Sequence, residues 1–171
     1  SPDGSRYTNI GEMVNKGFEF TIGAKIIENE GDGFNWEVNG NLSTLKNEVT
    51  KLYGDNDIIN DNRIVRKGEA VNSFYLKKWA GVDPEDGSPL WYVDGVGGAT
   101  TKKVGEAKYA VQGSHIPTLY GGFDTKLSYK NVTLSAQFSY GAGNKILDYF
   151  GRFVKSDGTL TATYPGYRSQ V

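Results

Sequence analysis

The sequence predicts an all-β fold of antiparallel strands, arranged as in part of a transmembrane β-barrel. Three observations lead to this prediction. Apolar residues recur at every second position over long stretches, which is typical of strands with one apolar face. The chain has 171 residues with 23 glycines and one methionine, a composition that argues against a helical protein. Short turns and long connections alternate along the chain, as they do in outer-membrane barrels.

The first strand pair is predicted on either side of residues 29–33. From Phe18 to Ile26 the even positions are apolar and the odd positions are mostly polar or small. The same alternation returns from Phe34 to Ser43. The residues between the two runs are rich in turn formers. We therefore expect an antiparallel hairpin here.

Two further hairpins follow the same pattern. Residues 119–130 and 132–140 alternate around a very tight turn at Lys130–Asn131. A shorter pair is predicted from Ser73–Val82 and Leu90–Val93, joined by residues 83–89, which are rich in Asp, Gly and Pro. Together the three hairpins give about six strands.

The lengths of the connections fall into two classes. The turns within hairpins are short, whereas the connections between hairpins are long. The long connections are residues 46–72, 94–117 and 141–171. A spanning barrel strand needs about 9–11 residues, which suits the first and last hairpins. The layout therefore matches short turns on one side of a membrane and long loops on the other.

The two parities of each strand predict two different faces. The polar parity, with Asn35, Glu37 and Asn39, suits a wet lumen, and aromatic residues such as Trp79, Tyr129 and Tyr140 are candidates for an interfacial girdle. The apolar parity is expected to face lipid, and its members are Phe18, Phe20, Ile22, Phe34, Trp36, Leu127, Leu134, Ala136 and Phe138. An ordinary sheet with one face on a core fits the same periodicity. A soluble β-sandwich that binds carbohydrate is therefore the alternative.

Composition excludes several kinds of site. The chain has no cysteine and a single histidine, His115, so it has no disulfide framework, no thiolate metal site and no multi-histidine centre. The net charge of −1 argues against a nucleic-acid binder.

The chain has no run of about 18 apolar residues, so no membrane-spanning helix is expected. Because it begins with a polar segment and not with Met, we interpret it as an excised piece.

No catalytic, metal or cofactor site is predicted, and we expect no enzyme activity. Asp83, Glu85 and Asp86 cluster in one stretch, but Asp-Pro and Asp-Gly pairs are turn formers, so a turn is favoured over paired catalytic carboxylates. Residues 55–62 are rich in Asp and Asn, yet they lack the glycine of a calcium loop, so a solvated loop is favoured. Residues 95–98, Gly-Val-Gly-Gly, do not lie between a strand and a helix, so they do not predict a phosphate loop.

Four aromatic residues in or near the long connections are weak candidates for stacking on a sugar ligand: Trp91, Tyr92, Tyr164 and Tyr167. Aromatic rings pack on the apolar faces of sugars. For Trp91 and Tyr92, a place in a strand or at the membrane interface is the favoured interpretation.

A succession of short motifs resembles a known family. Residues 9–20 (NIGEMVNKGFEF) are similar to the entry into a late barrel strand of SusC/RagA-type TonB-dependent transporters. The motifs of the next strands follow in the same order: FNW at 34–36, NLS at 41–43, GE at 68–69, SFY at 73–75, WAGVDP at 79–84, GSPLWY at 87–92, GG at 121–122 and FSYG at 138–141. Each motif is modest by itself, but their order and spacing agree from about residue 9 to residue 148.

This resemblance implies a parent protein in the outer membrane. The family's members are importers with a barrel of about 22 strands, an N-terminal plug, a segment that engages TonB and a SusD-like surface lipoprotein that caps the barrel. Their cargo is a glycan or an oligopeptide. The resemblance implies that residues 1–171 are a fragment from the C-terminal portion of such a barrel, without the plug. As an isolated piece it would have open edges through which it could self-associate.

Overall fold

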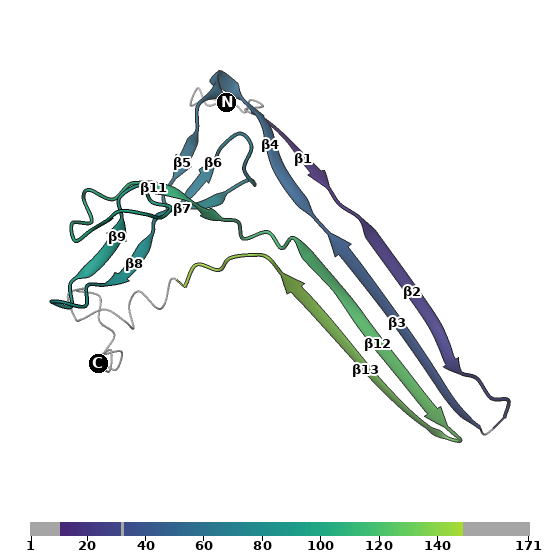
Figure 1. Ribbon diagram of the computed structural model, residues 1–171. Helices are drawn as coiled ribbons and strands as arrows, with labels where there is room; N and C mark the ends of the chain where they lie inside the picture. The colour runs from purple at the N-terminus through teal and green to yellow at the C-terminus, as the bar shows by residue number, and fades with distance from the viewer. Residues whose placement is uncertain (1–10, 32, 149–171) are drawn as a thin grey trace, which may run out of the picture.

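The computed structural model describes residues 11–31 and 33–148, and β-strands are the main secondary structure of this part of the chain (Figure 1). It has thirteen strands and one short 3-10 turn, η1 (Tyr53–Asp55). The strands form four sheets, and all their pairings are antiparallel. The all-β antiparallel fold is thereby confirmed. Among these residues no helix is long and apolar enough to cross a membrane.

The longest sheet contains the first and last predicted hairpins. β2 (Glu19–Ile27) pairs with β3 (Phe34–Thr44), and β12 (Leu119–Tyr129) pairs with β13 (Val132–Ala142). The order is β13-β12-β3-β2, so β3 and β12 join the two hairpins edge to edge (Figure 1). Both hairpin turns lie at the same end of this sheet.

The register of the long sheet places the apolar positions of its strands on one face and the polar positions on the other. Directly opposed residues of an antiparallel pair point to the same face. Leu127 lies opposite Trp36 on one side and Leu134 on the other, and Phe123 lies opposite Phe138. The same register aligns polar residues on the other face, where the opposed residues include Asn39, Asp124 and Gln137, and Glu37, Lys126 and Ser135. The predicted alternation therefore holds across all four strands. A register shift between Lys25 and Ile27 ends the strict alternation in β2.

Two strands prolong this sheet at the end away from the hairpin turns. β1 (Gly11–Lys16) precedes β2, β4 (Lys46–Leu52) follows β3, and the two pair with each other. At the junction, the Thr44 amide donates to the Phe18 carbonyl at 2.8 Å. Gly17 permits this close approach, because a Cβ at that position would lie 1.9 Å from the Thr44 carbonyl oxygen.

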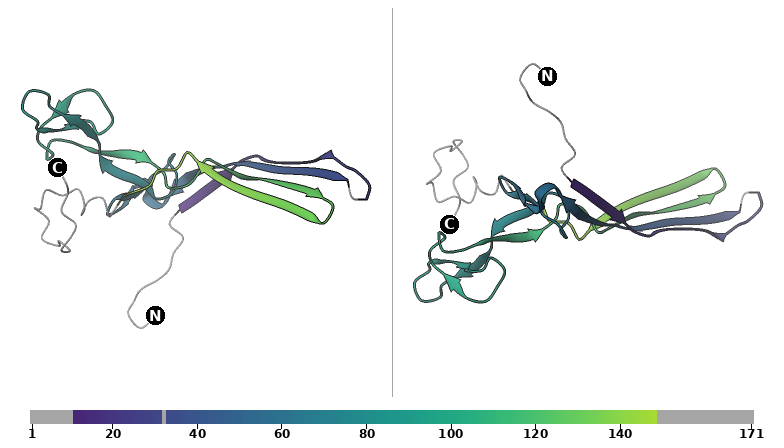
Figure 2. Two further views of the ribbon diagram at one scale, coloured as in Figure 1. Left: turned by 90° about the horizontal axis from the view of Figure 1, so that it is seen from below. Right: turned by 90° about the horizontal axis from the view of Figure 1, so that it is seen from above.

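The remaining strands fold into two small sheets at the end of the long sheet opposite the turns (Figures 1 and 2). One has the order β11-β7-β6-β5, and the other has the order β10-β9-β8. Their bounds are Ile58–Asn60 for β5, Arg63–Val65 for β6, Ser73–Lys77 for β7, Trp79–Val82 for β8, Pro89–Tyr92 for β9, Thr100–Thr101 for β10 and Tyr109–Gly113 for β11. Two of the predicted long connections, residues 46–72 and 94–117, therefore contain strands.

The small core of the described residues lies in the part of the chain between β3 and β12. Its buried side chains are Val49, Leu52, Ile64, Ser73, Phe74 and Ala107. Ile64 in β6 is fully buried, and Phe74 in β7 is 4% exposed. None of the buried residues belongs to β2, β3, β12 or β13. The chain between β3 and β12 therefore has a core of its own, and the described part of the long sheet has none.

The third predicted hairpin is only partly confirmed. β8 and β9 pair around residues 83–88, but Ser73–Val82 is two strands in different sheets, because β7 pairs with β6 and β11. β7 and β8 have five and four residues, fewer than the about 9–11 of a spanning strand. The long sheet therefore has four strands where about six were expected, and Trp79 lies outside it. The sequence break is at Lys77–Lys78, where two charged residues interrupt the alternation.

Candidate functional site

The apolar face of the long sheet is exposed in the described structure. Phe20 is 60% exposed, Leu134 64% and Phe138 59%. The register places eight of the nine predicted lipid-facing residues on this one face: Phe20, Ile22, Phe34, Trp36, Leu127, Leu134, Ala136 and Phe138. Phe18 comes just before β2, and its side chain is also exposed. Contact of this face with lipid remains a prediction.

Two aromatic side chains on the apolar face carry a polar group, and both groups are hydrogen-bonded within the sheet. The indole Nε1–H of Trp36 donates to Thr125 Oγ1 at 2.9 Å, and the Tyr140 hydroxyl donates to the Asn41 carbonyl oxygen at 3.1 Å. An unpaired donor in hydrocarbon costs several kcal/mol, since no water is there to accept the hydrogen bond. These pairings therefore suit a face that contacts lipid.

The opposite face carries a network of polar side chains. The Asn39 side-chain amide donates to Asp124 Oδ2 at 2.9 Å, and the Gly122 amide donates to Asn41 Oδ1 at 3.0 Å. Towards the hairpin turns, the strands border a shallow hollow, and its lining includes the polar-face residues Asn35, Glu37, Lys126 and Ser128. Lys25 and Glu28 form an ion pair there. This face therefore offers donors, acceptors and both signs of charge to an aqueous lumen.

The aromatic candidates in the connections lie in the sheet of β8, β9 and β10. Trp91 of β9 is half-buried and packs edge to face against Trp79 of β8, with ring centroids 5.6 Å apart. Tyr92 is held under the Lys78 ammonium, 5.4 Å from its ring centroid. Because neighbouring residues of a strand point to opposite faces, Trp91 and Tyr92 do not form one platform. Tyr164 and Tyr167 lie outside the described residues.

A second aromatic pair was not predicted. Tyr75 of β7 stacks on Tyr109 of β11, with ring centroids 5.5 Å apart, and Arg66 and Lys77 lie over these two rings. Arg66 also donates to Asp57 from Nε at 2.9 Å and from Nη2 at 2.7 Å, which raises the pKa of the guanidinium. The sequence signal was weak, since β7 and β11 are far apart in the chain.

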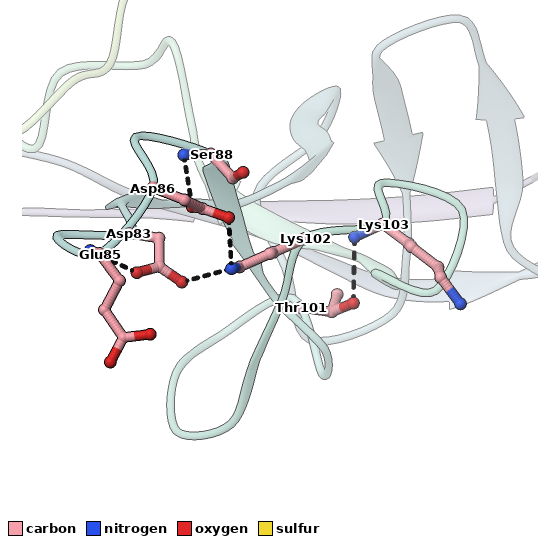
Figure 3. Close-up of polar contacts among 7 residues, drawn as sticks. All are labelled: Asp83, Glu85, Asp86, Ser88, Thr101, Lys102 and Lys103. Atoms are coloured by element: carbon pink, nitrogen blue, oxygen red, sulfur yellow. Dashed lines mark hydrogen bonds and ion pairs between the residues drawn. The ribbon is translucent and has the colours of Figure 1, made fainter.

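The carboxylates of residues 83–86 hold a turn (Figure 3). Asp83 Oδ1 accepts the Glu85 amide at 2.9 Å, and Asp86 Oδ1 accepts the Ser88 amide at 3.0 Å. Lys102 Nζ lies between them, 2.8 Å from Asp83 Oδ2 and 2.9 Å from Asp86 Oδ2. The hydrogen bond with Lys102 is the largest cause that lowers the pKa of Asp83, and together with hydrogen bonds from Ser88 it lowers the pKa of Asp86 to about 2. Both groups are therefore ionised at neutral pH, which is unsuitable for a general acid.

The other polar motifs also form hydrogen bonds within the chain. Asp94 Oδ1 accepts the amides of Val96 and Gly97 at 2.8 and 2.9 Å, so the glycine-rich stretch is an Asx turn. His115 lies 3.0 Å from Arg63 Nη1 through Nδ1. Between residues 11 and 148, with Asp32 left aside, no three side chains of His, Asp or Glu are grouped to hold a metal ion.

Comparison with known proteins identifies the family. No family model matches the chain. TonB-dependent receptor P3 of Formosa agariphila is 32% identical over 85% of this chain and 16% of its own length. SusC of Bacteroides thetaiotaomicron, also a TonB-dependent receptor, is 31% identical over 74% of this chain and 14% of its own length. The solved RagAB peptide transporter superposes with a TM-score of 0.78 and 30% identity, over 91% of this chain and 18% of that chain.

The chain is a segment of a SusC/RagA-type TonB-dependent receptor. It spans about one sixth of the length of the curated relatives that it matches. Its long sheet is accordingly a piece of the barrel wall of such a receptor, and the barrel is not closed by the four described strands. A second RagAB structure, the importer in its open-open state, matches with a TM-score of 0.70 over 82% of this chain. These relatives are named as receptors and transporters.

Proposed function

We propose that the parent of this TonB-dependent receptor segment imports a nutrient across the outer membrane. In this proposal residues 1–171 contribute barrel wall and extracellular loops from the C-terminal portion of the barrel. One observation carries the proposal: four antiparallel strands present one continuous apolar face and one continuous polar face. A barrel wall needs both, since it meets lipid outside and water inside.

The exposure of the apolar face argues against the soluble sandwich. A sandwich buries the inner face of each sheet against another sheet, about 10 Å away. In the described residues, Phe20, Ile22, Leu134 and Phe138 are all more than half exposed. Soluble monomers rarely expose a contiguous apolar patch larger than a few hundred Å².

The proposal also gives the segment an orientation and partners. The two hairpin turns face the periplasm, and the folded connections lie outside the cell, because barrels have short periplasmic turns and long outer loops. A SusD-like surface lipoprotein would cap the parent from outside, and TonB would act on its plug. The cargo is a glycan or an oligopeptide. Trp91, Tyr92, Tyr164 and Tyr167 remain candidates for cargo contact, and the segment is proposed to have no catalytic role.

The test compares two neighbouring positions of β13 in the full-length parent. Phe138 lies on the apolar face and Gln137 on the polar face, both near the middle of the strand. An arginine on the lipid face near the bilayer midplane costs about 2–4 kcal/mol, whereas one in the lumen has little effect. We expect Phe138→Arg to lower the amount of folded parent in the outer membrane, measured by heat-modifiable migration on gels, and Gln137→Arg to leave it unchanged.

Equal assembly of the two variants would reject the outward orientation of the apolar face. Import is tested separately, by uptake of labelled oligopeptides and oligosaccharides into cells that carry or lack the parent. An intact barrel that takes up neither class would reject the nutrient-import proposal while leaving the wall assignment in place.

The open edges of the isolated segment give a further test. β2 and β13 each pair on one side only within the described residues, and unpaired edges recruit other strands. We therefore expect residues 1–171 alone, without detergent, to self-associate in analytical ultracentrifugation. A stable monomer would instead favour the soluble sandwich.

A further inference from the structure

One surface loop, residues 93–108, is closed at its base and has almost no apolar anchor. The Lys108 amide donates to the Val93 carbonyl at 3.0 Å, so the two ends of the loop lie together, as in an Ω-loop. Within it only Gly95 and Ala107 are buried. Val96 is 61% exposed and Val104 48%. Ala107 is therefore the one apolar side chain of this loop that is buried.

Charged and polar side chains tether the loop instead. Lys77 Nζ donates to the Val104 carbonyl at 2.6 Å, and Lys78 Nζ donates to the Val96 carbonyl at 2.7 Å. The loop's own Lys102 reaches back to the turn between β8 and β9, where it bridges Asp83 and Asp86 (Figure 3). Exposed contacts of this kind are individually weak. A segment with few buried apolar contacts opens at a lower free energy than the rest of a protein.

The loop also covers one edge of β9. Its two-residue strand β10 pairs Thr100 with Tyr92 and Thr101 with Trp91. β10 is the end strand of its sheet, with the order β10-β9-β8. If the loop lifts away, the backbone edge of β9 becomes free, and the neighbouring side of Trp91 is uncovered.

We propose that residues 93–108 form a strap that opens from β9 as a unit, with Lys102 as its latch. The strap rests on the contacts of this loop, whereas its location outside the cell rests on the function proposed above. Opening frees a strand edge beside Trp91 and leaves the wall strands β12 and β13 intact.

Hydrogen–deuterium exchange of the purified full-length parent tests the strap. The variant is Lys102→Met, and its matched control is Lys103→Met, because Lys103 pairs with Glu106 inside the loop, at 3.2 Å, and does not tether it. We expect peptides from residues 94–106 to exchange about two- to tenfold faster in Lys102→Met, as the loss of one exposed and one partly buried ion pair implies. Exchange in β12 and β13 should stay unchanged, and Lys103→Met should behave as the parent does.

A second variant distinguishes the loss of the ion pair from local misfolding. Asp86→Asn removes one charge of the latch but keeps an oxygen that can accept the Ser88 amide, so the turn is preserved. We expect faster exchange of the strap here too, by a smaller factor than in Lys102→Met. Equal exchange in Lys102→Met and Lys103→Met would overturn the strap, and so would equal acceleration in β12 and β13. Import is not part of this readout, so a failed import assay leaves the result interpretable.

Discussion

The hydroxyl of Tyr140 in β13 donates a hydrogen bond to the backbone carbonyl of Asn41 in β3, 3.1 Å away. These two strands are not neighbours, because β12 lies between them. Tyr140 is paired with Gly121 of β12, and the ring lies close above that glycine: a Cβ at position 121 would be 2.6 Å from the Tyr140 hydroxyl. One aromatic side chain thus fixes the relative positions of three strands.

Gly121→Ala should therefore impair the wall. The new methyl group would also lie 2.2 Å from the Asn41 carbonyl oxygen, so the backbone must move as well as Tyr140. Overpacking of this kind costs about 1–3 kcal/mol. We expect less folded full-length receptor in the outer membrane, measured by heat-modifiable migration. Gly141→Ala is the matched control, since nothing lies within 4 Å of its Cβ position. Similar losses in the two variants would contradict the role of Tyr140.

Thr125→Val should destabilise the apolar face although it makes that face more apolar. It removes the oxygen that accepts the Trp36 indole N–H at 2.9 Å and leaves this donor unpaired. Hydrogen bonds between side chains in membranes contribute about 0.6 kcal/mol on average and up to about 1.7 kcal/mol. We expect a lower midpoint of thermal unfolding of the detergent-solubilised receptor. Thr133→Val on the polar face is the control, and an equal or larger effect there would argue against the Trp36–Thr125 bond.

Ile64→Ala should loosen the outer sheets and spare the wall. Ile64 is fully buried in β6, and removing its side chain costs about 2–5 kcal/mol. The core of residues 46–118 shares no buried side chain with the long sheet. We expect faster proteolysis within residues 53–116 of the membrane-embedded receptor, with β12 and β13 still protected. Ile59→Ala, at a position that is 57% exposed, should change little. Protection lost equally in the wall would show that the two parts unfold together.

The ion pairs of Lys102 predict a pH dependence. The folded-state pKa of Asp86 is lowered to about 2, first by its hydrogen bond with Lys102. A lowered carboxyl pKa stabilises the folded form at pH values above its ordinary value, and this contribution disappears as the pH falls towards the folded-state value. The latch should therefore be constant from neutral pH to about pH 4 and weaken between about pH 4 and pH 2. Carbon-13 NMR of labelled aspartate should show the Asp86 titration midpoint rising in Lys102→Met, and an unchanged midpoint would refute this coupling.

The alternation of the sequence predicted the wall accurately because it is a local signal. A strand of nine to eleven residues carries four or five complete periods of two, as in residues 119–129, and the adjoining turn fixes the register of the hairpin. Eight of the nine residues assigned to the apolar parity consequently lie on one face.

The connections were harder to predict for the opposite reason. β5 and β6 have three residues each and β10 has two, which is too short for a period of two to stand out. Ser73–Val82 looked like one strand, because nothing in its local pattern says that Phe74 is buried while Trp79 is exposed. Asp83 and Asp86 were correctly interpreted as turn residues, yet their partner Lys102 lies far along the chain.

The sequence by itself determined that the chain is antiparallel β, where its two long hairpins lie, which residues share a face, and which family its motifs resemble. These properties are set by neighbouring residues and short turns. The tertiary structure decided that β3 and β12 join the hairpins into one wall, that Ile64 and Phe74, in the chain between these two strands, are buried, and that Lys102 pairs with Asp83 and Asp86. Such contacts join residues distant in sequence, and they form only where long-range packing outweighs the entropy of closing the chain between them.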